Sequence, residues 1–334
     1  MRVGMIKAAG FIRKNAGAIA LNALVCFFTV SLVLDPKRCI SSVYSGLVLF
    51  ATNVAPALFP FFFFTKLLTS LGTASVLGKA LRRPVAALYN APPIGGYIYL
   101  MSVVSGYPVG ARLIGDMYRS GVIDADDARC ISTFTSTSGP LFIVGTVGTM
   151  MFGDPVLGYI AMACHFIGAL LNGLIYRRKT PSAPKAEFSP ACTDSLLGSG
   201  MTEAITSILL VGGYIAVFSM VIDVLSDIGA VDALASPLGK LLGALGQDPD
   251  IAEALVVGSI ELTRGCKLLS ELGLQTKTAL PYLAGMLSFG GLSIAFQSLA
   301  FCSACKIKTS FFALSKLTQA IVTIALSSLV ALLL

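Results

Sequence analysis

Long uncharged stretches constrain the fold of this chain more than any other feature of its sequence. They cover residues 15–34, 40–65, 84–111, 130–153, 204–222, 278–305 and 317–334, and residues 155–176 carry no charge apart from that of His165. A helix of about 20 apolar residues crosses a bilayer. Only 12% of the 334 residues are charged, against about 25% in soluble domains. Because the runs are continuous and lack the alternation of a membrane barrel, the sequence predicts an all-α polytopic membrane protein.

Glycine and proline interrupt these runs at places that should lie at membrane depth. The run from Pro84 ends in Ser105–Ala111 (SGYPVGA), and Arg112 follows directly. Further breaks are expected at Ser136–Leu141, near Gly258–Gly265 and at Gly290–Gly291. Broken backbone is tolerated inside a membrane only where it is buried in protein or lines a cavity. We therefore expect the four breaks to form one binding site.

The breaks are distributed over two halves of the chain with similar motif order. We predict an N-terminal transmembrane helix at 1–39, a first repeat at 40–176, a cytoplasmic linker at 177–200 and a second, inverted repeat at 201–334. Each repeat should contain a re-entrant hairpin (84–122 and about 251–270) and a broken transmembrane helix (130–152 and 278–303). Inverted repeats with broken helices indicate a secondary transporter.

The charges suggest how the chain crosses the membrane. Basic residues gather at 1–14, 79–83 and 177–185, and Lys306, Lys308 and Lys316 precede the expected last helix, 317–334. Acidic residues dominate from Asp223 to Glu253. The positive-inside rule places the basic groups and the N-terminus in the cytoplasm. The net charge of +7 thus sets topology, and we expect no nucleic-acid partner.

Side chains near the breaks favour an anionic ligand. Helix N-termini attract anions, and Arg112 and Lys267 follow the two hairpin breaks at matching places. The candidate substrate-binding residues are Ser105, Gly106, Tyr107, Gly110, Arg112, Thr137, Ser138, Gly139, Thr263, Lys267, Ser288, Gly290, Gly291, Ser293 and Gln297. Any single hydroxyl could instead donate to a carbonyl of its own helix. The glycine pair could serve only for close helix packing, and the Arg112 side chain could instead extend to the cytoplasmic interface.

Two ionisable residues inside apolar surroundings need separate interpretation. Glu261 is a candidate coupling group, because a carboxylate at membrane depth binds protons readily. An ion pair with Arg264 or Lys267 is an equally good reading of Glu261. His165 stands alone in its run, which favours a packed, hydrogen-bonded histidine over a proton relay.

Motifs for catalysis or cofactor binding are missing. The sequence has no phosphate-binding P-loop, no zinc-type histidine spacing and no GxSxG. Its eight cysteines are scattered and favour packing over metal binding or redox chemistry. Asp124 or Asp126 fits a helix cap. We expect no catalytic residue, no cofactor and no metal.

Several segments together resemble a known family. They are Pro56–Phe61 (PALFPF), Ser105–Ala111 (SGYPVGA), Thr137–Phe142 (TSGPLF) and Ser288–Ser293 (SFGGLS) with Gln297. They resemble the sporulation integral membrane proteins of the YlbJ type, within the wider group that has nucleoside-recognition (Gate) domains. The resemblance implies transport of dipicolinic acid, a pyridine dicarboxylate, across the outer forespore membrane. The wider group also includes domains fused to nucleoside carriers and iron transporters, so fold alone does not fix the substrate.

Three functions are therefore weighed. The first is a carrier that moves dipicolinate by alternating access. The second is a nucleoside or nucleobase carrier that would use Tyr107 for stacking and Gln297 for hydrogen bonds. The third is a spore-envelope assembly protein that transports nothing. The expected partners are the lipid bilayer and a small anionic substrate, and a homo-oligomer is left open.

Overall fold

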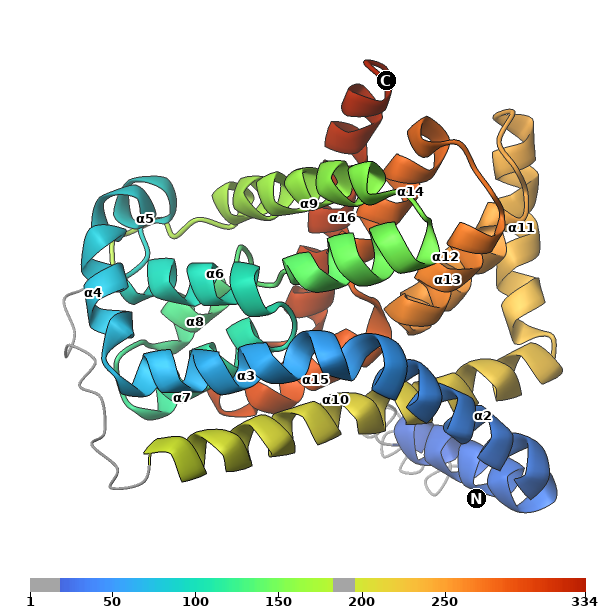
Figure 1. Ribbon diagram of the computed structural model, residues 1–334, viewed down its shortest axis with the longest axis horizontal. Coiled ribbons are helices and arrows are strands. Elements are labelled where there is room, and N and C mark those ends of the chain that lie inside the picture. Colours follow the sequence, from blue (N-terminus) through green and yellow to red (C-terminus); the bar gives the residue numbers. More distant parts are fainter. Residues whose placement is uncertain (1–18, 183–195) are drawn as a thin grey trace, which may run out of the picture.

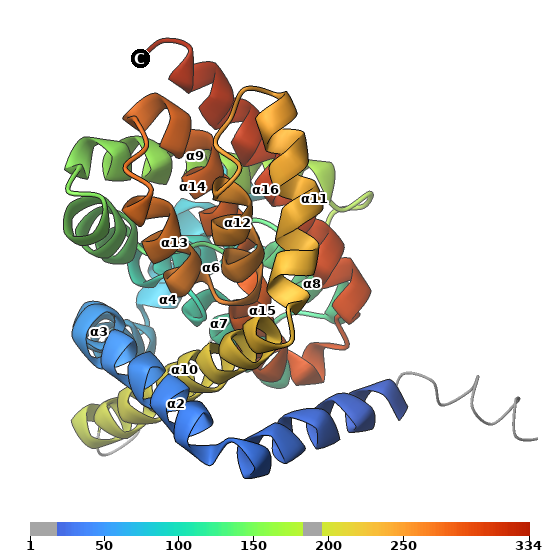
Figure 2. The ribbon, with the colours of Figure 1, turned by 90° about the vertical axis from the view of Figure 1, so that its right-hand side faces the viewer.

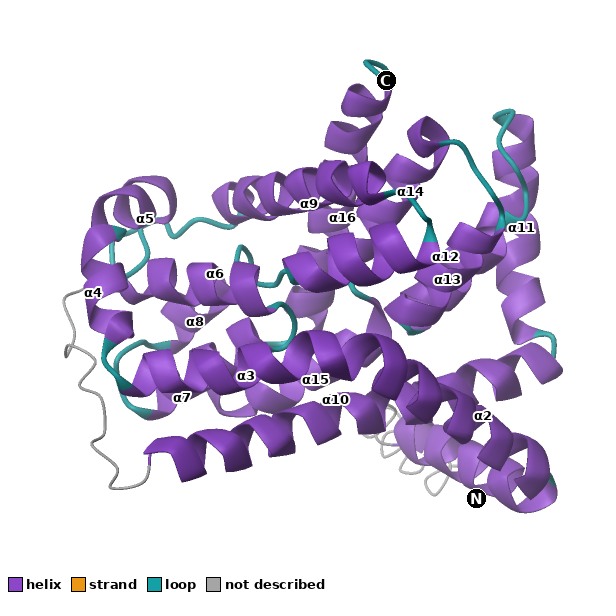
Figure 3. Ribbon diagram, in the orientation of Figure 1, coloured by secondary structure: helices purple, strands orange, loops and turns teal. Residues whose placement is uncertain are grey.

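A computed structural model of the protein describes residues 19–182 and 196–334, and this part of the chain consists of helices and connecting loops, without a β-strand (Figure 3). Among the described residues, four stretches are long and apolar enough to cross a membrane: α9 (Pro155–Ile175), Gly200–Asp227 within α10 (Leu196–Asp227), Thr276–Phe301 and α16 (Thr309–Ala331). A bent pair of N-terminal helices adds a fifth stretch if it is one span. The prediction of an all-α polytopic membrane protein is confirmed.

The bent pair joins a helix over Ile19–Leu34 to Pro36–Val54 at an angle of 108°. The side chain of Asp35 accepts a hydrogen bond from the Arg38 N–H, and Pro36 occupies the first helical position, so a new helix begins here. This is α2 (Pro36–Leu49), which continues through η1 (Phe50–Val54) into α3 (Ala55–Ser70). The α2–α3 rod packs along α10, whereas the helix before it projects from the body (Figures 1 and 2).

The first half continues with short helices. α4 (Thr73–Ala80) and α5 (Arg82–Tyr89) lead into a hairpin of α6 (Ile94–Ser105) and α7 (Val109–Arg119). α8 (Ala125–Ser132) and the wide-turn helix η2 (Leu141–Met151) follow, separated by the irregular residues 133–140. Asp124 and Asp127 form a reciprocal cap at the start of α8, which confirms the predicted cap.

The second half has elements in a corresponding order. α10 and α11 (Ala230–Ala244) precede a hairpin of α12 (Ile251–Ile260) and α13 (Leu262–Glu271). α14 (Thr276–Phe289) is interrupted at Gly290 before α15 (Gly291–Phe301), a short turn η3 (Ser303–Cys305) and α16. The domain boundaries and the inverted relation between the halves stay predictions.

The last helix differs from its predicted bounds. It begins at Thr309 and not at 317, so Lys316 lies inside α16 and is 3% exposed. The expectation that Lys316 belongs to a cytoplasmic loop was therefore wrong. Residues Ser315, Gln319, Thr323 and Ser327 lie at helical spacing on the same buried face. α16 turns this polar face toward α9 and α14, which pack against it.

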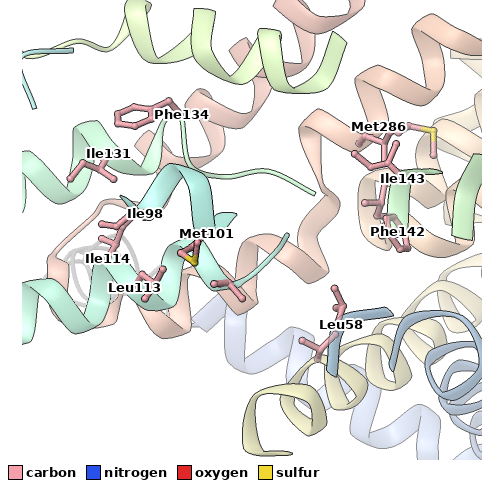
Figure 4. Packing of buried hydrophobic residues seen from close by; sticks show 14 of the residues in the cluster. Leu58, Ile98, Met101, Leu113, Ile114, Ile131, Phe134, Phe142, Ile143 and Met286 are labelled. Carbon is pink, nitrogen blue, oxygen red and sulfur yellow. The ribbon is translucent and has the colours of Figure 1, made fainter. Parts of the chain in front are cut away.

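Buried apolar side chains hold the broken elements together (Figure 4). Ile98 of α6, Ile114 of α7 and Ile131 of α8 are at most 1% exposed. Phe142 and Ile143 of η2 form a second labelled group with Met286 of α14. Such shape-dependent packing stabilises helices in lipid, where helices gain little from the hydrophobic effect. It positions the ends of α6, α8, α12 and α14 for the contacts described below.

Asp154, in the loop before α9, links the two halves. Its carboxylate accepts hydrogen bonds from the Val156 and Leu157 N–H groups and from the Thr276 hydroxyl at 2.8 Å. The Leu157 N–H, followed by Thr276, lowers the pKa of this carboxyl. Because the folded pKa is depressed, the stabilisation is complete above the ordinary pKa and is lost as the pH falls through the lowered value.

The Asp154→Ala variant is expected to lower the free energy of unfolding by about 1–2 kcal/mol at pH 7. The deficit should shrink from about pH 4 downward, where native Asp154 also loses its charge. Thermal unfolding of detergent-purified protein at pH 7 and below pH 4 measures this. Asp154→Asn, which keeps a capping oxygen, is the control and should lose less. A deficit that does not change with pH would contradict this role of the charge.

Candidate functional site

The first hairpin break and the first helix break lie against each other. α6 ends at Ser105, and Gly106 has a φ of 77°, which glycine adopts without strain. A Cβ at Gly106 would strike the backbone nitrogen of Gly139, in the irregular segment before η2. The chain can therefore pass from α6 to α7 only because residue 106 has no side chain.

The two breaks of the second half meet in the same way. Gly291 has a φ of 77°, and a Cβ there would lie 2.8 Å from the Gly258 carbonyl oxygen and 3.3 Å from that of Ile260. The start of α15 thus rests on the end of α12. Tyr107 connects the two pairs, since its hydroxyl lies 3.0 Å from the Ser136 carbonyl oxygen and 3.2 Å from that of Leu287. All four breaks therefore meet.

A cavity of about 430 Å³, including its mouth, opens beside this junction. Its lining includes six residues expected from the sequence: Tyr107, Ser138, Gly139, Glu261, Thr263 and Gln297. Val54, Leu58, Phe142, Val211, Ile215, Leu262 and Ile294 supply the apolar part. The geometry is that of a mostly apolar pocket with a few convergent polar groups.

Lys316 of α16 contacts Tyr107. Its Nζ donates to the Tyr107 hydroxyl at 2.7 Å, to Gln319 Oε1 at 2.8 Å and to the Ser136 carbonyl oxygen at 3.1 Å. The Nζ also lies 4.9 Å from the centre of the Tyr107 ring. Within the described part of the chain, no carboxylate lies within ion-pair distance of this ammonium group, so its partners are all neutral.

His165 connects the breaks of the two halves through hydrogen bonds. Its Nε2 accepts from the Ser138 N–H at 2.9 Å, so this nitrogen is unprotonated. Nδ1 then carries the proton and donates to the Ser288 hydroxyl at 2.8 Å. Ser288 in turn donates to Thr323 of α16 at 2.9 Å. The structure thus shows a packed, neutral histidine, the reading that the sequence favoured.

Glu261 forms the turn between α12 and α13. It is 2% exposed, and its carboxylate accepts from the Arg264 N–H at 2.8 Å and from the Thr263 hydroxyl at 3.1 Å. The Arg264 guanidinium is directed elsewhere, to Asp223 at 2.8 Å. The N-terminus of α13 offsets the charge of Glu261 in place of the ion pair considered from the sequence.

Arg112 and Lys267, expected together at the site, lie apart from each other and outside the cavity. Arg112 pairs with Glu203 of α10 and contacts the Ser207 hydroxyl. It lines a separate hollow with Lys66, and the Lys66 ammonium also pairs with Glu203 at 2.8 Å. The Lys267 side chain is 59% exposed and lies 3.9 Å from Glu271. In this conformation, the structure brings neither cation to the cavity.

The remaining candidates surround the junction. The Ser105 hydroxyl bonds that of Thr65 at 2.6 Å, and Ser293 accepts from Gln297 at 3.3 Å. Gly110 packs against Ser102 and the Thr135 carbonyl, and Gly290 against the Tyr107 ring. Thr137 is 1% exposed, and its hydroxyl has no hydrogen-bond partner within the described residues. Such a group indicates spare capacity to bind a ligand or water.

The Arg112→Ala variant is expected to weaken binding of a dicarboxylate less than about threefold, because the pair with Glu203 already neutralises the guanidinium. Equilibrium binding of radiolabelled dipicolinate to purified protein measures this. A loss of tenfold or more would return Arg112 to the binding site. Such a loss would show that Glu203 gives way to the substrate.

Comparison with known proteins gives one informative match. The chain is 27% identical, over 333 residues, to the sporulation integral membrane protein YlbJ of Bacillus subtilis (strain 168). The match covers 92% of this chain and 81% of the relative. The chain is similar to a YlbJ-type sporulation membrane protein over most of its length. No family model matches it, and no solved structure does.

The similarity confirms the resemblance seen in the motifs. It also agrees with the multi-pass membrane architecture of the structure, because the relative is an integral membrane protein. The nucleoside-recognition (Gate) assignment stays a prediction. Sequence reasoning missed Lys316, although polar residues at helical spacing (Ser315, Lys316, Gln319, Thr323 and Ser327) offered a signal.

Proposed function

We propose that this protein is a secondary carrier for a small organic anion, with dipicolinate as the substrate. The observation that carries the proposal is the ammonium of Lys316, buried where four helix breaks meet and surrounded by neutral partners. A buried charge without a counter-ion is costly. An anion in the cavity that Tyr107 lines would offset it.

The helix ends at the junction support an anionic ligand. Four helices begin at the breaks: α7, η2, α13 and α15. The structure gives a side-chain cap only to α13, through Glu261, and none to the described starts of the other three. Uncapped N-termini present N–H groups and a partial positive charge, which suit a carboxylate. The Tyr107 hydroxyl accepts from Lys316 and donates to the Ser136 and Leu287 carbonyls; in our proposal it turns this proton to the anion when one binds.

The proposal also includes how the substrate crosses the membrane. In our proposal, the hairpins α6–α7 and α12–α13 move relative to a frame that includes α3 and α10. The two halves act as the inverted pair expected from the sequence, and alternating access results. The protein would serve in sporulation, as the name of its relative indicates, in the outer forespore membrane with a cytoplasmic N-terminus.

A nucleoside carrier is the second candidate, since Tyr107 and Gln297 both line the cavity. The observation against it is the position of Lys316 near the Tyr107 ring. A neutral nucleoside in the cavity would leave this charge without a partner. The anion is therefore the better fit.

The test is uptake into liposomes that contain the purified protein, with dipicolinate, uridine and citrate compared. We expect saturable dipicolinate uptake that exceeds uptake of the other two compounds. Lys267→Met is the matched control for Lys316→Met, because it removes one ammonium from an exposed position outside the cavity. Saturable uridine uptake instead would assign the protein to the nucleoside carriers. No uptake by folded protein would favour an assembly role in the spore envelope.

A further inference from the structure

The contacts of Lys316 depend on its being protonated. An ammonium has three N–H donors, and three acceptors surround this one: Tyr107, Ser136 and Gln319. Two of these acceptors belong to the breaks of the first half, whereas Lys316 belongs to the last helix. The charged state therefore ties α16 to the α6–α7 break and to the segment before η2.

Loss of the proton would rearrange this junction. A neutral amine has two N–H groups and a lone pair, so one of the three acceptors would lose its donor. The Tyr107 hydroxyl, now within reach of the Ser136 and Leu287 carbonyls, could donate to the lone pair instead. The Tyr107 proton would then be turned away from any anion in the cavity.

No other charged group in the described structure contacts the Lys316 ammonium. α9 presents His165, which is held neutral by the Ser138 N–H. α14 presents Ser288 and Leu287. α8 presents Arg129, whose guanidinium carbon lies 4.1 Å from the centre of the Phe311 ring. From the α12–α13 turn, Glu261 reaches the cavity that Tyr107 also lines. Because none of these charged groups contacts Lys316, an anion nearby would act strongly on the charge of its ammonium group.

We infer that Lys316 is the coupling group, which takes up one proton when the anion binds and releases it when the anion leaves. This inference rests on the proposed function. The step is an acid–base equilibrium, in which an amine and a proton form an ammonium, and no electron is transferred. At neutral pH a dicarboxylate carries two negative charges. When one proton accompanies each dianion, one net negative charge therefore crosses the membrane with each substrate molecule.

Two driving forces should act on dipicolinate uptake into liposomes with the full-length protein. An acidic exterior should raise accumulation, up to about tenfold for each pH unit. An inside-positive potential, set with potassium and valinomycin, should speed uptake, because net negative charge enters. Uptake that responds to neither force would overturn the inference and leave the proposed function intact. No uptake by folded protein would overturn the proposed function, and the inference with it.

Substitutions of single residues show which residue binds the transported proton. Arginine keeps a positive charge but does not lose its proton in proteins. In Lys316→Arg, the ratio of uptake with the pH gradient to uptake without it should fall to about one, whereas dipicolinate exchange across the membrane remains measurable. Lys267→Arg is the matched control and should keep the wild-type ratio.

Glu261→Gln separates the other candidate for coupling. In this variant, the ratio of dipicolinate uptake with the pH gradient to uptake without it should stay at the wild-type value, whatever the absolute rate of uptake. A ratio near one in Glu261→Gln, or a wild-type ratio in Lys316→Arg, would overturn the assignment to Lys316. If Lys316→Arg fails to fold, the proton flux of the wild type decides. A pH-sensitive dye should report one proton entering with each dipicolinate, and substrate entry without proton entry would overturn the inference.

Discussion

Replacing Lys316 with methionine is expected to weaken dipicolinate binding by about 30- to 150-fold, which corresponds to about 2–3 kcal/mol for a charge-assisted hydrogen bond in a buried site. The ammonium donates to the Tyr107 hydroxyl at 2.7 Å, and this contact strengthens the hydroxyl as a donor toward an anion in the cavity. Methionine fills similar space in α16 without a charge. Equilibrium binding of radiolabelled dipicolinate to purified protein measures the change.

The control for this prediction is Lys267→Met, which removes the same group from an exposed position beside Glu271. It should bind dipicolinate within about twofold of the wild type, as expected for a solvent-screened charge. Equal losses in both variants would mean that overall charge, and not the site, attracts the anion. Wild-type affinity in folded Lys316→Met would mean that Lys316 takes no part in binding the anion.

Gly106→Ala is expected to destabilise the fold more than a glycine-to-alanine change at any position outside the junction of the four breaks. A Cβ in the left-handed region costs about 1–2 kcal/mol, and overpacking against backbone adds about 1–3 kcal/mol. The added methyl group would meet the Gly139 backbone, which cannot move without displacing the start of η2. Thermal unfolding of purified protein measures the loss.

Gly121→Ala isolates the effect of the close approach. Gly121 has a φ of 72°, similar to that of Gly106, but nothing lies within 4 Å of a Cβ placed there. This variant should show the conformational cost alone. If both variants unfold at the same temperature, the contact between the two breaks does not contribute to stability.

The sequence allowed the helices and their interruptions to be predicted because their causes are local. Uncharged runs require helices in lipid, and glycine or proline inside such a run ends a helix wherever neighbouring residues cannot compensate. Gly106 and Gly290 could be recognised in this way. Glu261 could also be recognised, since an acid in the middle of an apolar hairpin is conspicuous. Each of these three residues lies at an observed break.

The environment of Lys316 could not be predicted in this way. A lysine that follows Lys306 and Lys308 looks like the last charge before a span, and the positive-inside rule treats it as such. Its burial depends on Tyr107, which is 209 positions earlier in the chain. Contacts over that separation are set by tertiary packing and leave no local pattern. Only the helical spacing of polar residues along α16 pointed to a buried polar face.

The matching positions of Arg112 and Lys267 led to the wrong prediction that both cations lie at the site, and the reason is geometric. Three residues, 106–108, separate α6 from α7, whereas Glu261 alone separates α12 from α13. The two second arms therefore start with a different helical phase. Residues at equal places in the two motifs then project in different directions, one toward Glu203 and the other toward the exposed surface.

The most direct test is to locate the anion. A crystal of the protein grown with 4-bromopyridine-2,6-dicarboxylate would reveal the bromine by its anomalous scattering. We predict a peak in the cavity lined by Tyr107, Glu261 and Gln297, lost in crystals of Lys316→Met. A peak in the hollow beside Arg112 and Lys66, or no peak at a concentration that saturates uptake, would contradict the proposed site.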